Sequence, residues 1–355
     1  MYPKNAKFFR GKQNFFSNVK INIDKYNIYY INFYLHWRDF TFRFCTLKKE
    51  INSLGGTHEF IQDDRNNDVL IYVNGELVPR DKAKVSVFDS AFLVGDGVWE
   101  SFRLHNGKLA FVDKHLDRLN ANLKALDYDL GMPLESLIDA VYETVQANDM
   151  VSDVHIRLMI TRGIKRSPSQ DPRSNIGGPT IVIIAEYKVP DRGEREGINL
   201  FTVHVRRGRP DVQDPKLHPH SKLNCVISCI QAIQAGANEA LMLDPQGFVS
   251  TCNSTNFFIV RRNQVWTSTG QYCLNGITRG NIIELCREND IEVFEKDFSL
   301  MEVYSANEVF LTGTFGGVAH VSKVDGRVIG DGQMGKMSRR LNALYSSLLE
   351  KECPG

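Results

Sequence analysis

The alternation of apolar and polar positions becomes regular at residue 69 and predicts a hairpin there. An apolar run at 69–73 is followed by Asn74 and Gly75 and then by Glu76 and the apolar residues at 77–78. An Asn-Gly pair between apolar runs favours a two-residue turn, because type I′ turns need positive φ at both central residues. The sequence therefore predicts two short antiparallel strands at the start of a regularly folded region.

Two amphipathic helices and a series of strands follow this hairpin. Apolar residues recur at intervals of three and four within 116–126 and again within 134–145, which is the spacing of one helix face. Further patterns predict strands at 155–161, 180–186, 199–205, 240–243, 257–260 and 308–311, and helices at 223–235, 280–287 and 337–349. This order mixes helices and strands without strict alternation, so we expect an α+β fold.

A segment rich in Pro, Gly and Arg indicates where one domain ends and the next begins. A polar stretch rich in Pro, Gly and Arg runs through 187–214 and is interrupted only by the predicted strand. We therefore expect a smaller α/β domain at 69–186, an interdomain connection at 187–199 and a larger mixed domain at 200–350. No nucleotide-binding glycine motif of the GxGxxG or GxxxxGK[ST] kind occurs.

Composition sets residues 1–68 apart as an unassigned N-terminal extension. This segment holds 15 of the 36 aromatic residues, and it carries 11 Lys and Arg against 7 acidic residues. It has no sustained helical or strand period. One interpretation is a basic, aromatic arm that docks on a partner or a membrane surface. The other, which we favour, is an accessory extension or an over-long gene model.

Charge and cysteine usage exclude several classes of protein. The 43 Lys and Arg nearly balance the 42 Asp and Glu, so no net field attracts the chain to nucleic acid. No apolar run reaches the ~18 residues that would predict a membrane span. The seven cysteines form no CxxC pair and read as reduced thiols, with no metal site. Together with the lack of a signal-peptide core, they favour a cytoplasmic protein.

Three short segments have the chemistry of anion-binding backbone. The first, 274–280 (LNGITRG), places Gly and Thr where a loop opens onto a helix, so that free N–H groups and the helix dipole face a ligand. The second, 312–317 (TGTFGG), ends a strand with small and hydroxyl residues. The third, 115–119 (HLDRL), puts an arginine beside an apolar stripe, where an anion would offset its burial.

These segments, with their surroundings, resemble class IV (fold type IV) pyridoxal-phosphate aminotransferases. The segment 86–100 (SVFDSAFLVGDGVWE), followed by HLDRL, is similar to the N-terminal signature of that family. The resemblance continues through 155–157 (HIR), 161–163 (TRG), 256–258 (NFF) and the two turns above, in the family's order over residues 69–350. It implies a two-domain fold type IV enzyme, with pyridoxal 5′-phosphate between a smaller N-terminal and a larger C-terminal domain.

The resemblance also implies roles for individual residues. The cofactor's phosphate would be held by Arg118, Ile277, Thr278 and Thr314. The substrate carboxylate would meet Arg157 and the turn at Phe315, with His155 in place of the family's tyrosine. Side-chain specificity would come from the region of Val94 and Trp99, where many branched-chain enzymes have Tyr and Phe.

The sequence departs from the family at the catalytic lysine. An ungapped comparison places His218 at the position of the lysine that forms the internal aldimine, and Lys222 falls one helical turn later. We expect Lys222 to form that bond, provided that the Pro219 segment reshapes the backbone. The alternatives are Lys216 or no aldimine lysine at all.

A second departure concerns the pyridine nitrogen of the cofactor. The family keeps this nitrogen protonated with a glutamate, and the matching residue here is Thr251. A hydroxyl stabilises a pyridinium less than a carboxylate does, so the electron sink should be weaker. Asp244 and Glu239 are the nearest acidic residues in sequence that could compensate.

The resemblance finally implies an activity and a partner. It favours transfer of an amino group between an amino acid, branched-chain-like or D-configured, and a 2-oxo acid, by a homodimer. A catalytically impaired cofactor-binding homologue and an aminodeoxychorismate-lyase-like enzyme remain as alternatives.

Overall fold

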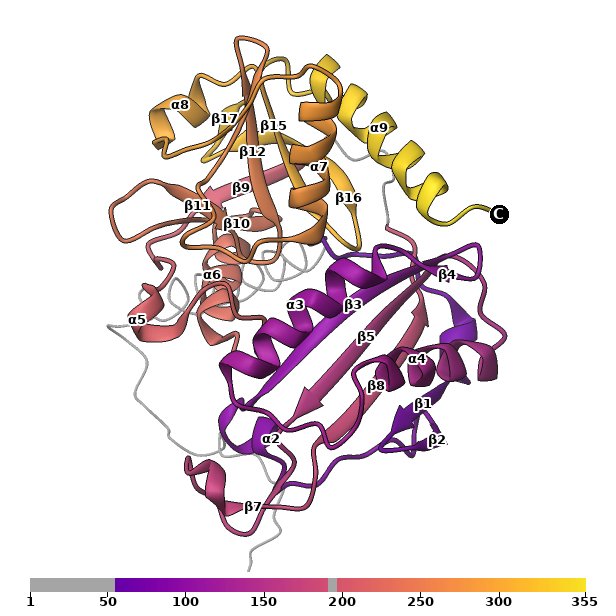
Figure 1. Ribbon diagram of the computed structural model, residues 1–355. Helices are drawn as coiled ribbons and strands as arrows, with labels where there is room; N and C mark the ends of the chain where they lie inside the picture. The colour runs from indigo at the N-terminus through magenta and orange to yellow at the C-terminus, as the bar shows by residue number, and fades with distance from the viewer. Residues whose placement is uncertain (1–54, 191–196) are drawn as a thin grey trace, which may run out of the picture. The chain divides into compact units, whose positions relative to one another are not determined.

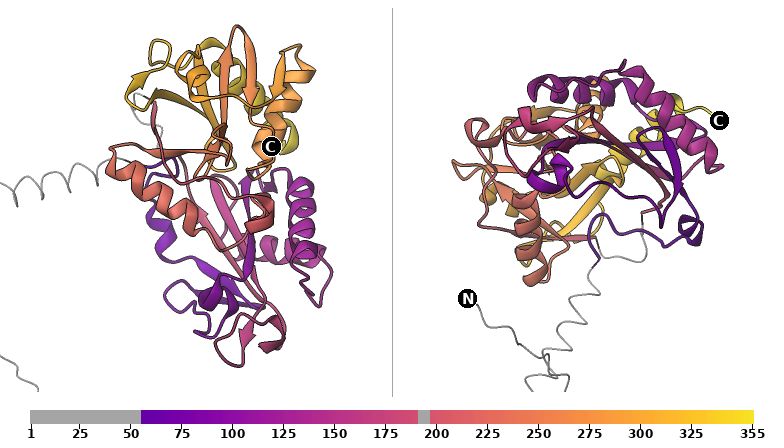
Figure 2. Two further views of the ribbon diagram at one scale, coloured as in Figure 1. Left: turned by 90° about the vertical axis from the view of Figure 1, so that its left-hand side faces the viewer. Right: turned by 90° about the horizontal axis from the view of Figure 1, so that it is seen from below.

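The computed structural model describes residues 55–190 and 197–355. Most of the aromatic extension, residues 1–54, and much of the predicted connection at 187–199 therefore lie outside the described residues. Two mixed layers of sheet and helix make up the described part (Figures 1 and 2). The expected α+β class is confirmed, whereas the exact domain limits remain predictions.

The first layer is a six-stranded sheet in the order β2-β1-β8-β5-β3-β4. Its strands are β1 (Leu70–Val73), β2 (Glu76–Pro79), β3 (Gly97–His105), β4 (Lys108–Leu109), β5 (Val154–Thr161) and β8 (Thr180–Tyr187). The predicted hairpin is confirmed: β1 and β2 pair antiparallel, and Asn74 and Gly75 have φ of 50° and 94°. A two-stranded pair of β6 (Ile164–Lys165) and β7 (Asn175–Ile176) lies outside this sheet.

Helices cover one face of this sheet (Figure 1). The two predicted helices correspond to α3 (Val112–Ala125) and α4 (Glu135–Ala147), and α3 begins four residues earlier than its leucine pattern indicates. Leu119 and Leu123 of α3 and Val141 of α4 are buried in one core with the strand residues. The short elements of this region are η1 (Asp64–Asn67), α2 (Ser90–Val94) and η2 (Pro172–Ser174).

The second layer is a nine-stranded sheet in the order β11-β10-β9-β16-β15-β12-β13-β14, with β17 paired to β16. Its strands are β9 (Ile198–Thr202), β10 (Glu239–Leu243), β11 (Val249–Cys252), β12 (Asn256–Arg261), β13 (Gln264–Thr267), β14 (Val293–Glu295), β15 (Glu308–Gly313), β16 (Gly317–Val324) and β17 (Arg327–Val328). The helices of this region are α5 (Pro210–Gln213), α6 (Leu223–Gln234), α7 (Ile277–Glu288), α8 (Leu300–Tyr304) and α9 (Lys336–Glu352). Three predicted bounds were wrong: β9 ends at Thr202 rather than 205, α7 begins at Ile277 rather than 280, and α9 ends at Glu352 rather than 349.

Hydrogen bonds tie the two layers together near the start of β3. Segment 218–220 runs along the free edge of β3: the amide of Trp99 donates to the carbonyl of His218 (3.1 Å) and that of His220 to Gly97 (2.8 Å). Gly97 is required there, since a Cβ would lie 2.5 Å from the His220 ring. The segment just before α6 is therefore positioned by a strand of the first layer.

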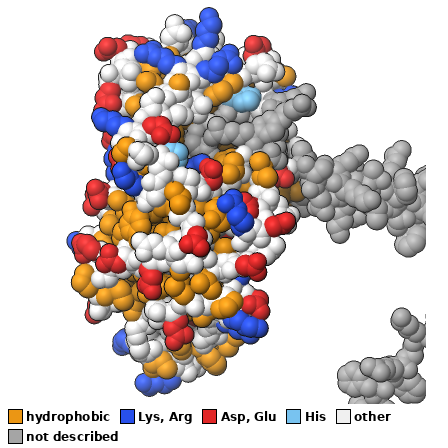
Figure 3. All heavy atoms as spheres, turned by 90° about the vertical axis from the view of Figure 1, so that its right-hand side faces the viewer, with side chains coloured by type: hydrophobic (Ala, Val, Ile, Leu, Met, Phe, Trp, Pro, Cys, Tyr) orange, Lys and Arg blue, Asp and Glu red, His pale blue; other side chains and the backbone are white. Residues whose placement is uncertain are grey.

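The described surface carries charges of both signs. On the face shown in Figure 3, Lys and Arg side chains are interspersed with Asp and Glu. In the described ranges, no helix is both long and apolar enough to cross a membrane.

Candidate active site

Two adjoining cavities lie where the family-like segments meet. The smaller, of about 90 Å³, is lined by all four predicted phosphate-binding residues. The larger, of about 390 Å³, is lined by Lys222 and Thr251. Trp99, Arg157, His218 and Asn256 line both cavities, so the two spaces share a wall.

The start of α7 forms one side of the smaller cavity. Its N-cap, Gly276, makes no side-chain cap, so the first-turn N–H groups at Ile277 and Thr278 are available to an anion. A Cβ on Gly276 would lie 2.2 Å from the amide oxygen of Asn256, whose nitrogen donates to the carbonyl of Leu274 (2.9 Å). Glycine is therefore needed for the loop to approach this closely.

Arg118 projects from α3 into the same cavity and is held by a buried carboxylate. Its Nε and Nη2 donate to Glu100 at 2.8 and 2.7 Å, and Nδ1 of His115 lies 2.7 Å from the same carboxylate. Burial alone would raise the pKa of Glu100, but Arg118 and the hydrogen bonds hold that pKa well below its usual range. The pair fixes the guanidinium in position.

The end of β15 and the turn after it supply hydroxyl groups to the same cavity. Thr312, Thr314 and Phe315 line the smaller cavity, and the Oγ1 of Thr312 is buried without a hydrogen-bond partner among the described residues. A buried hydroxyl without a partner is costly unless a ligand supplies one. The donor set of guanidinium, backbone amides and hydroxyls fits a phosphate group.

The Trp99 ring lies in the wall that the two cavities share, next to Arg157, His218 and Lys222. The guanidinium carbon of Arg157 lies 3.7 Å from the ring centroid, the His218 ring centroid 3.6 Å away, and the Nζ of Lys222 6.0 Å away. Arg157 keeps a buried Nε without a partner in the described part of the chain. A cation held against an indole with an unused N–H is suited to a carboxylate ligand.

Lys222 and His218 both line this site, but their pKa values differ. Burial, together with the positive charge of nearby arginines, lowers the pKa of Lys222 to about 8. Burial lowers the pKa of His218 to about 3, so its ring is neutral at neutral pH. Its Nδ1 lies 3.6 Å from Glu100, too far for a good hydrogen bond. Lys216 is exposed and lines neither cavity.

Thr251 and the two acidic residues near it in sequence occupy different positions. Thr251 is buried, lines the larger cavity and donates from Oγ1 to the carbonyl of Thr255 (2.8 Å). Glu239 accepts hydrogen bonds from Ser254 and Thr255, and its other oxygen, Oε2, has no partner among the described residues. Asp244 instead caps a turn by accepting from the amides of Gln246 and Phe248, and it lines neither cavity.

Two outcomes differ from what the sequence patterns indicated. Val94 ends α2 with 42% of its surface exposed and lines neither cavity, so it is not brought together with Trp99 in the described chain. Conversely, His58, Arg207 and Cys225 line the site without having been predicted as site residues. His58 has no helical or strand period around it, whereas Cys225 was interpreted only as a reduced thiol.

This fold, with joined cavities beside an antiparallel sheet and a mixed sheet, is that of fold type IV pyridoxal-phosphate enzymes. The family model "Amino-transferase class IV" matches residues 97–324. The chain therefore belongs to the class IV aminotransferase family, whose members use pyridoxal phosphate.

Individual relatives include branched-chain-type aminotransferases and D-alanine aminotransferases. The chain is 41% identical over 285 residues to "Branched-chain-amino-acid aminotransferase-like protein 2" of Arabidopsis thaliana, covering 80% of this chain and 51% of the relative. It is 40% identical to a putative branched-chain-amino-acid aminotransferase of Methanocaldococcus jannaschii, covering 79% and 96%. The chain thus spans about half of the plant relative.

A solved structure shares the fold. The branched-chain aminotransferase of the thermophilic archaeon Thermoproteus uzoniensis, solved with norvaline, superimposes with a TM-score of 0.72 at 28% identity, covering 80% of this chain and 96% of that one. The fold type IV architecture expected from the sequence is therefore confirmed.

Proposed function

We propose that this protein is a pyridoxal-phosphate-dependent aminotransferase that moves an amino group between an amino acid and a 2-oxo acid, with Lys222 as its catalytic lysine. The observation that carries this proposal is the position of Lys222. Its amine lines the larger cavity, beside the cavity with the phosphate-type donor set, and has a pKa lowered to about 8. At neutral pH a useful fraction of that amine is unprotonated and nucleophilic.

The residues present fit the cofactor. Arg118, the amides at Ile277 and Thr278, and Thr314 would hold its phosphate, and Thr251 would meet the ring nitrogen. When bound, the cofactor supplies a carbonyl carbon that bonds to amino groups and a conjugated ring that takes up electrons from the substrate.

The chain's own groups supply orientation and proton transfer. Arg157 and the turn at Phe315 would hold the substrate carboxylate, since an unpaired guanidinium N–H and backbone amides are charge-assisted donors. The Trp99 ring lines both cavities. The amine of Lys222 would then accept a proton from the substrate's α-carbon and donate it to the reactive carbon of the cofactor.

A catalytically impaired homologue is the second candidate. The sequence comparison aligns His218, which is neutral, with the family's lysine, and Thr251 uses its hydroxyl hydrogen on the carbonyl of Thr255. Both features weaken the chemistry without disturbing the phosphate-binding side. A lyase reaction remains a further alternative and is distinguished by pyruvate release without an added 2-oxo acid.

We further propose a homodimer. Helix α6 exposes a stripe at Leu223, Val226, Ile227 and Ile230, with 70%, 50%, 41% and 47% of each surface accessible. Apolar residues at this helical spacing are suited to burial against another copy. Sedimentation of the purified chain measures this directly, and a monomer at micromolar concentration would contradict it.

The decisive experiment for the activity is chemical mapping. Borohydride reduction of the cofactor-loaded protein, followed by peptide mass analysis, identifies the lysine that carries the cofactor. We expect the label on Lys222, together with loss of the visible absorption on addition of an amino donor. A protein that binds the cofactor but shows neither label nor response to any donor would overturn the aminotransferase in favour of the impaired homologue.

A further inference from the structure

The larger cavity carries positive charge and has no acidic side chain of its own. Arg157, Arg207 and Lys222 all line it, and none of the described residues that line either cavity is Asp or Glu. Nearby cations disfavour a further positive charge in the same space. A protonated ring nitrogen beside Thr251 therefore needs a negative charge from behind the cavity wall.

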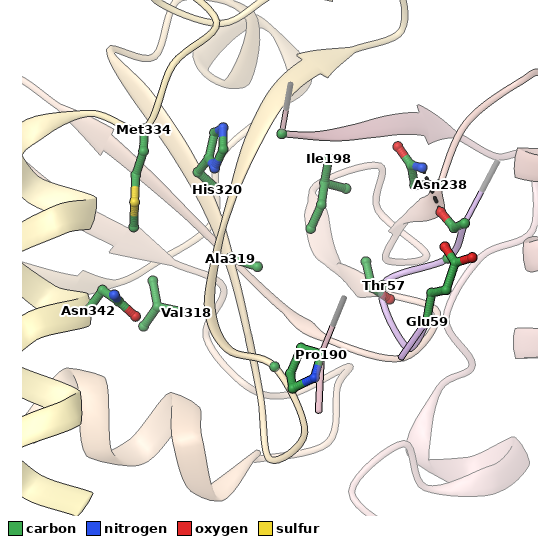
Figure 4. A pocket seen from close by; sticks show the side chains of 14 residues that line it. Thr57, Glu59, Pro190, Ile198, Asn238, Val318, Ala319, His320, Met334 and Asn342 are labelled. Atoms are coloured by element: carbon green, nitrogen blue, oxygen red, sulfur yellow. Dashed lines mark hydrogen bonds between the residues drawn. The ribbon is translucent and has the colours of Figure 1, made fainter. Parts of the chain in front are cut away.

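Glu239 supplies a buried carboxylate behind this wall. It opens β10 with 1% of its surface exposed. The preceding residue, Asn238, lines a separate cavity of about 180 Å³ and donates to the carbonyl of Gly55 (2.7 Å; Figure 4). Glu239 itself contacts Ser254 and Thr255, which line the larger cavity. One layer of residues therefore separates the carboxylate from the ligand space.

The described hydrogen-bond partners of Glu239 are all neutral. The amide and hydroxyl of Ser254 and the hydroxyl of Thr255 donate to Oε1 at 2.9, 2.8 and 3.0 Å. The second oxygen, Oε2, is buried and has no partner in the described part of the chain. Because none of these partners is a cation, the negative potential of the carboxylate extends to its surroundings.

Thr255 links Glu239 to Thr251. The hydroxyl of Thr255 donates to Glu239, and its carbonyl accepts from the hydroxyl of Thr251 (2.8 Å). A carbonyl can only accept, so the single hydroxyl hydrogen of Thr251 is used there, and its oxygen can only accept a hydrogen bond from a ligand. A protonated ring nitrogen is a donor and an unprotonated one is an acceptor. Thr251 is therefore matched to the protonated form alone.

The charge of Glu239 acts on other groups at the larger cavity. Cys229 and Cys252 line this cavity, and burial, followed by the negative charge of Glu239, raises the pKa of both thiols. Burial lowers the pKa of His58, and the charge of Glu239 opposes that change. In all three cases the carboxylate favours the protonated form, as it would for a ring nitrogen in the same cavity.

We propose that Glu239 is a positioning residue that acts through Thr255 and Thr251 to keep the ring nitrogen of the bound cofactor protonated. This inference rests on the proposed cofactor site but not on the role of Lys222. Asp244, the other acidic residue nearby in sequence, caps a turn and lines neither cavity. Because two threonines lie between the charge and the ligand, Glu239 should support the nitrogen less than a directly bonded carboxylate would.

Nitrogen-15 NMR of a ring-labelled cofactor measures this protonation directly. The probe is pyridoxamine 5′-phosphate with nitrogen-15 in the ring, bound to the full chain and titrated with pH; it has no aldehyde and forms no bond to a lysine. Glu239→Gln keeps an acceptor oxygen for the three donors and removes only the charge. It should weaken the proton affinity of the ring nitrogen about tenfold relative to the unsubstituted protein.

Thr251 variants give a second, independent test of the same relay. Thr251→Val removes the accepting oxygen and should also weaken the proton affinity, whereas Thr251→Ser keeps the hydroxyl and should retain it. Asp244→Asn is the matched control, because it removes a buried negative charge but keeps the oxygen that caps the turn. Its ring-nitrogen titration should equal that of the unsubstituted protein.

The outcomes separate this inference from the proposed activity. An unchanged titration in Glu239→Gln or in Thr251→Val, or an equal change in Asp244→Asn, overturns the role of Glu239. A probe that does not bind overturns the cofactor site and the role of Glu239 together. The expected titrations combined with no borohydride label on any lysine would count against the aminotransferase function alone.

Discussion

The two joined cavities differ in how closely they follow the family. The phosphate-type side has every expected group, with Arg118 fixed by Glu100 and an uncapped helix start at Ile277. The larger cavity is lined by His218 and Thr251, which the sequence comparison aligns with the family's lysine and glutamate, and by Lys222. The helical turn predicted between His218 and Lys222 is absent, because segment 218–220 pairs with β3 and α6 begins at Leu223. The residues proposed for phosphate binding and those proposed for turnover lie on different elements, so substitutions can test the two roles separately.

The reason lies in what each side requires. An anion site depends on backbone amides and one well-placed cation, and α7 and α3 supply these through their own geometry. A catalytic amine depends on the reach of a single side chain. That reach changes with any shift of segment 218–222, which lies between the edge of β3 and the start of α6.

The largest expected effect comes from Lys222→Ala. Removing the amine should lower the rate of amino transfer by about 10²- to 10⁴-fold, the usual contribution of a positioned acid–base group, while leaving cofactor phosphate binding in place. Stopped-flow absorption after mixing with an amino donor measures this.

Two further variants test that assignment. Lys216→Ala, at an exposed position outside both cavities, should leave the rate unchanged. Adding His218→Lys to Lys222→Ala should return the borohydride label, now at position 218, if the family register can be restored. An active Lys222→Ala protein would refute the role of Lys222.

Next in size is Arg118→Ala on the phosphate-binding side. It leaves Glu100 buried with its main cationic partner removed, and breaking a buried pair in this way costs about 3–5 kcal/mol of stability. Thermal unfolding should report the loss, and cofactor affinity should fall with it. In the Glu100→Gln background the same substitution should cost clearly less stability, and an equal cost would contradict the paired role.

A smaller, opposite effect is expected at the ring-nitrogen side. Thr251→Glu should speed proton removal from the substrate by about tenfold, equivalent to about 1.4 kcal/mol of barrier, because a carboxylate stabilises a protonated ring nitrogen. Single-turnover kinetics measures it, with Thr251→Val as the size-matched control. A slower Thr251→Glu protein that still binds cofactor would show that another group, such as Glu239, already serves the nitrogen.

The smallest effect is the pH dependence of Lys222. A pKa lowered from 10.5 to about 8 means that the folded protein releases this proton at a lower pH than the unfolded chain does. Stability should therefore rise with pH between about 8 and 10.5, where the unfolded state binds more protons. The rate of cofactor capture should rise about fivefold from pH 7 to 8 and then level off. The same profile in Lys222→Ala would place the titration elsewhere.

The sequence predicted the elements whose local signals are strong. The Asn74-Gly75 pair was enough to predict the hairpin of β1 and β2, and the leucine spacing was enough to predict α3. The three anion-binding segments also meet at one cavity, as expected. Strand β3 was missed as an element, because Glu100 and Arg103 interrupt its apolar pattern. Glu100 is nevertheless fully buried, and its partners come from α3, a long-range pairing that no local pattern contains.

His58 and Lys222 show the same limit at the site. The packing of residues 55–61 onto the cavity depends on contacts with Asn238 and Val189, far along the chain. Whether Lys222 lines the cavity depends on how segment 218–220 pairs with β3, which residue types alone do not determine.

The pairing of segment 218–220 with β3 also allows the cooperativity of unfolding to be measured at two amides. The amides of Trp99 and His220 are protected by hydrogen bonds that exist only while both sheets are folded and docked on each other. Their hydrogen exchange should therefore follow the least stable of the two layers rather than the layer to which each residue belongs. A ligand that draws the layers together would slow exchange at these two amides first, without having to touch either one.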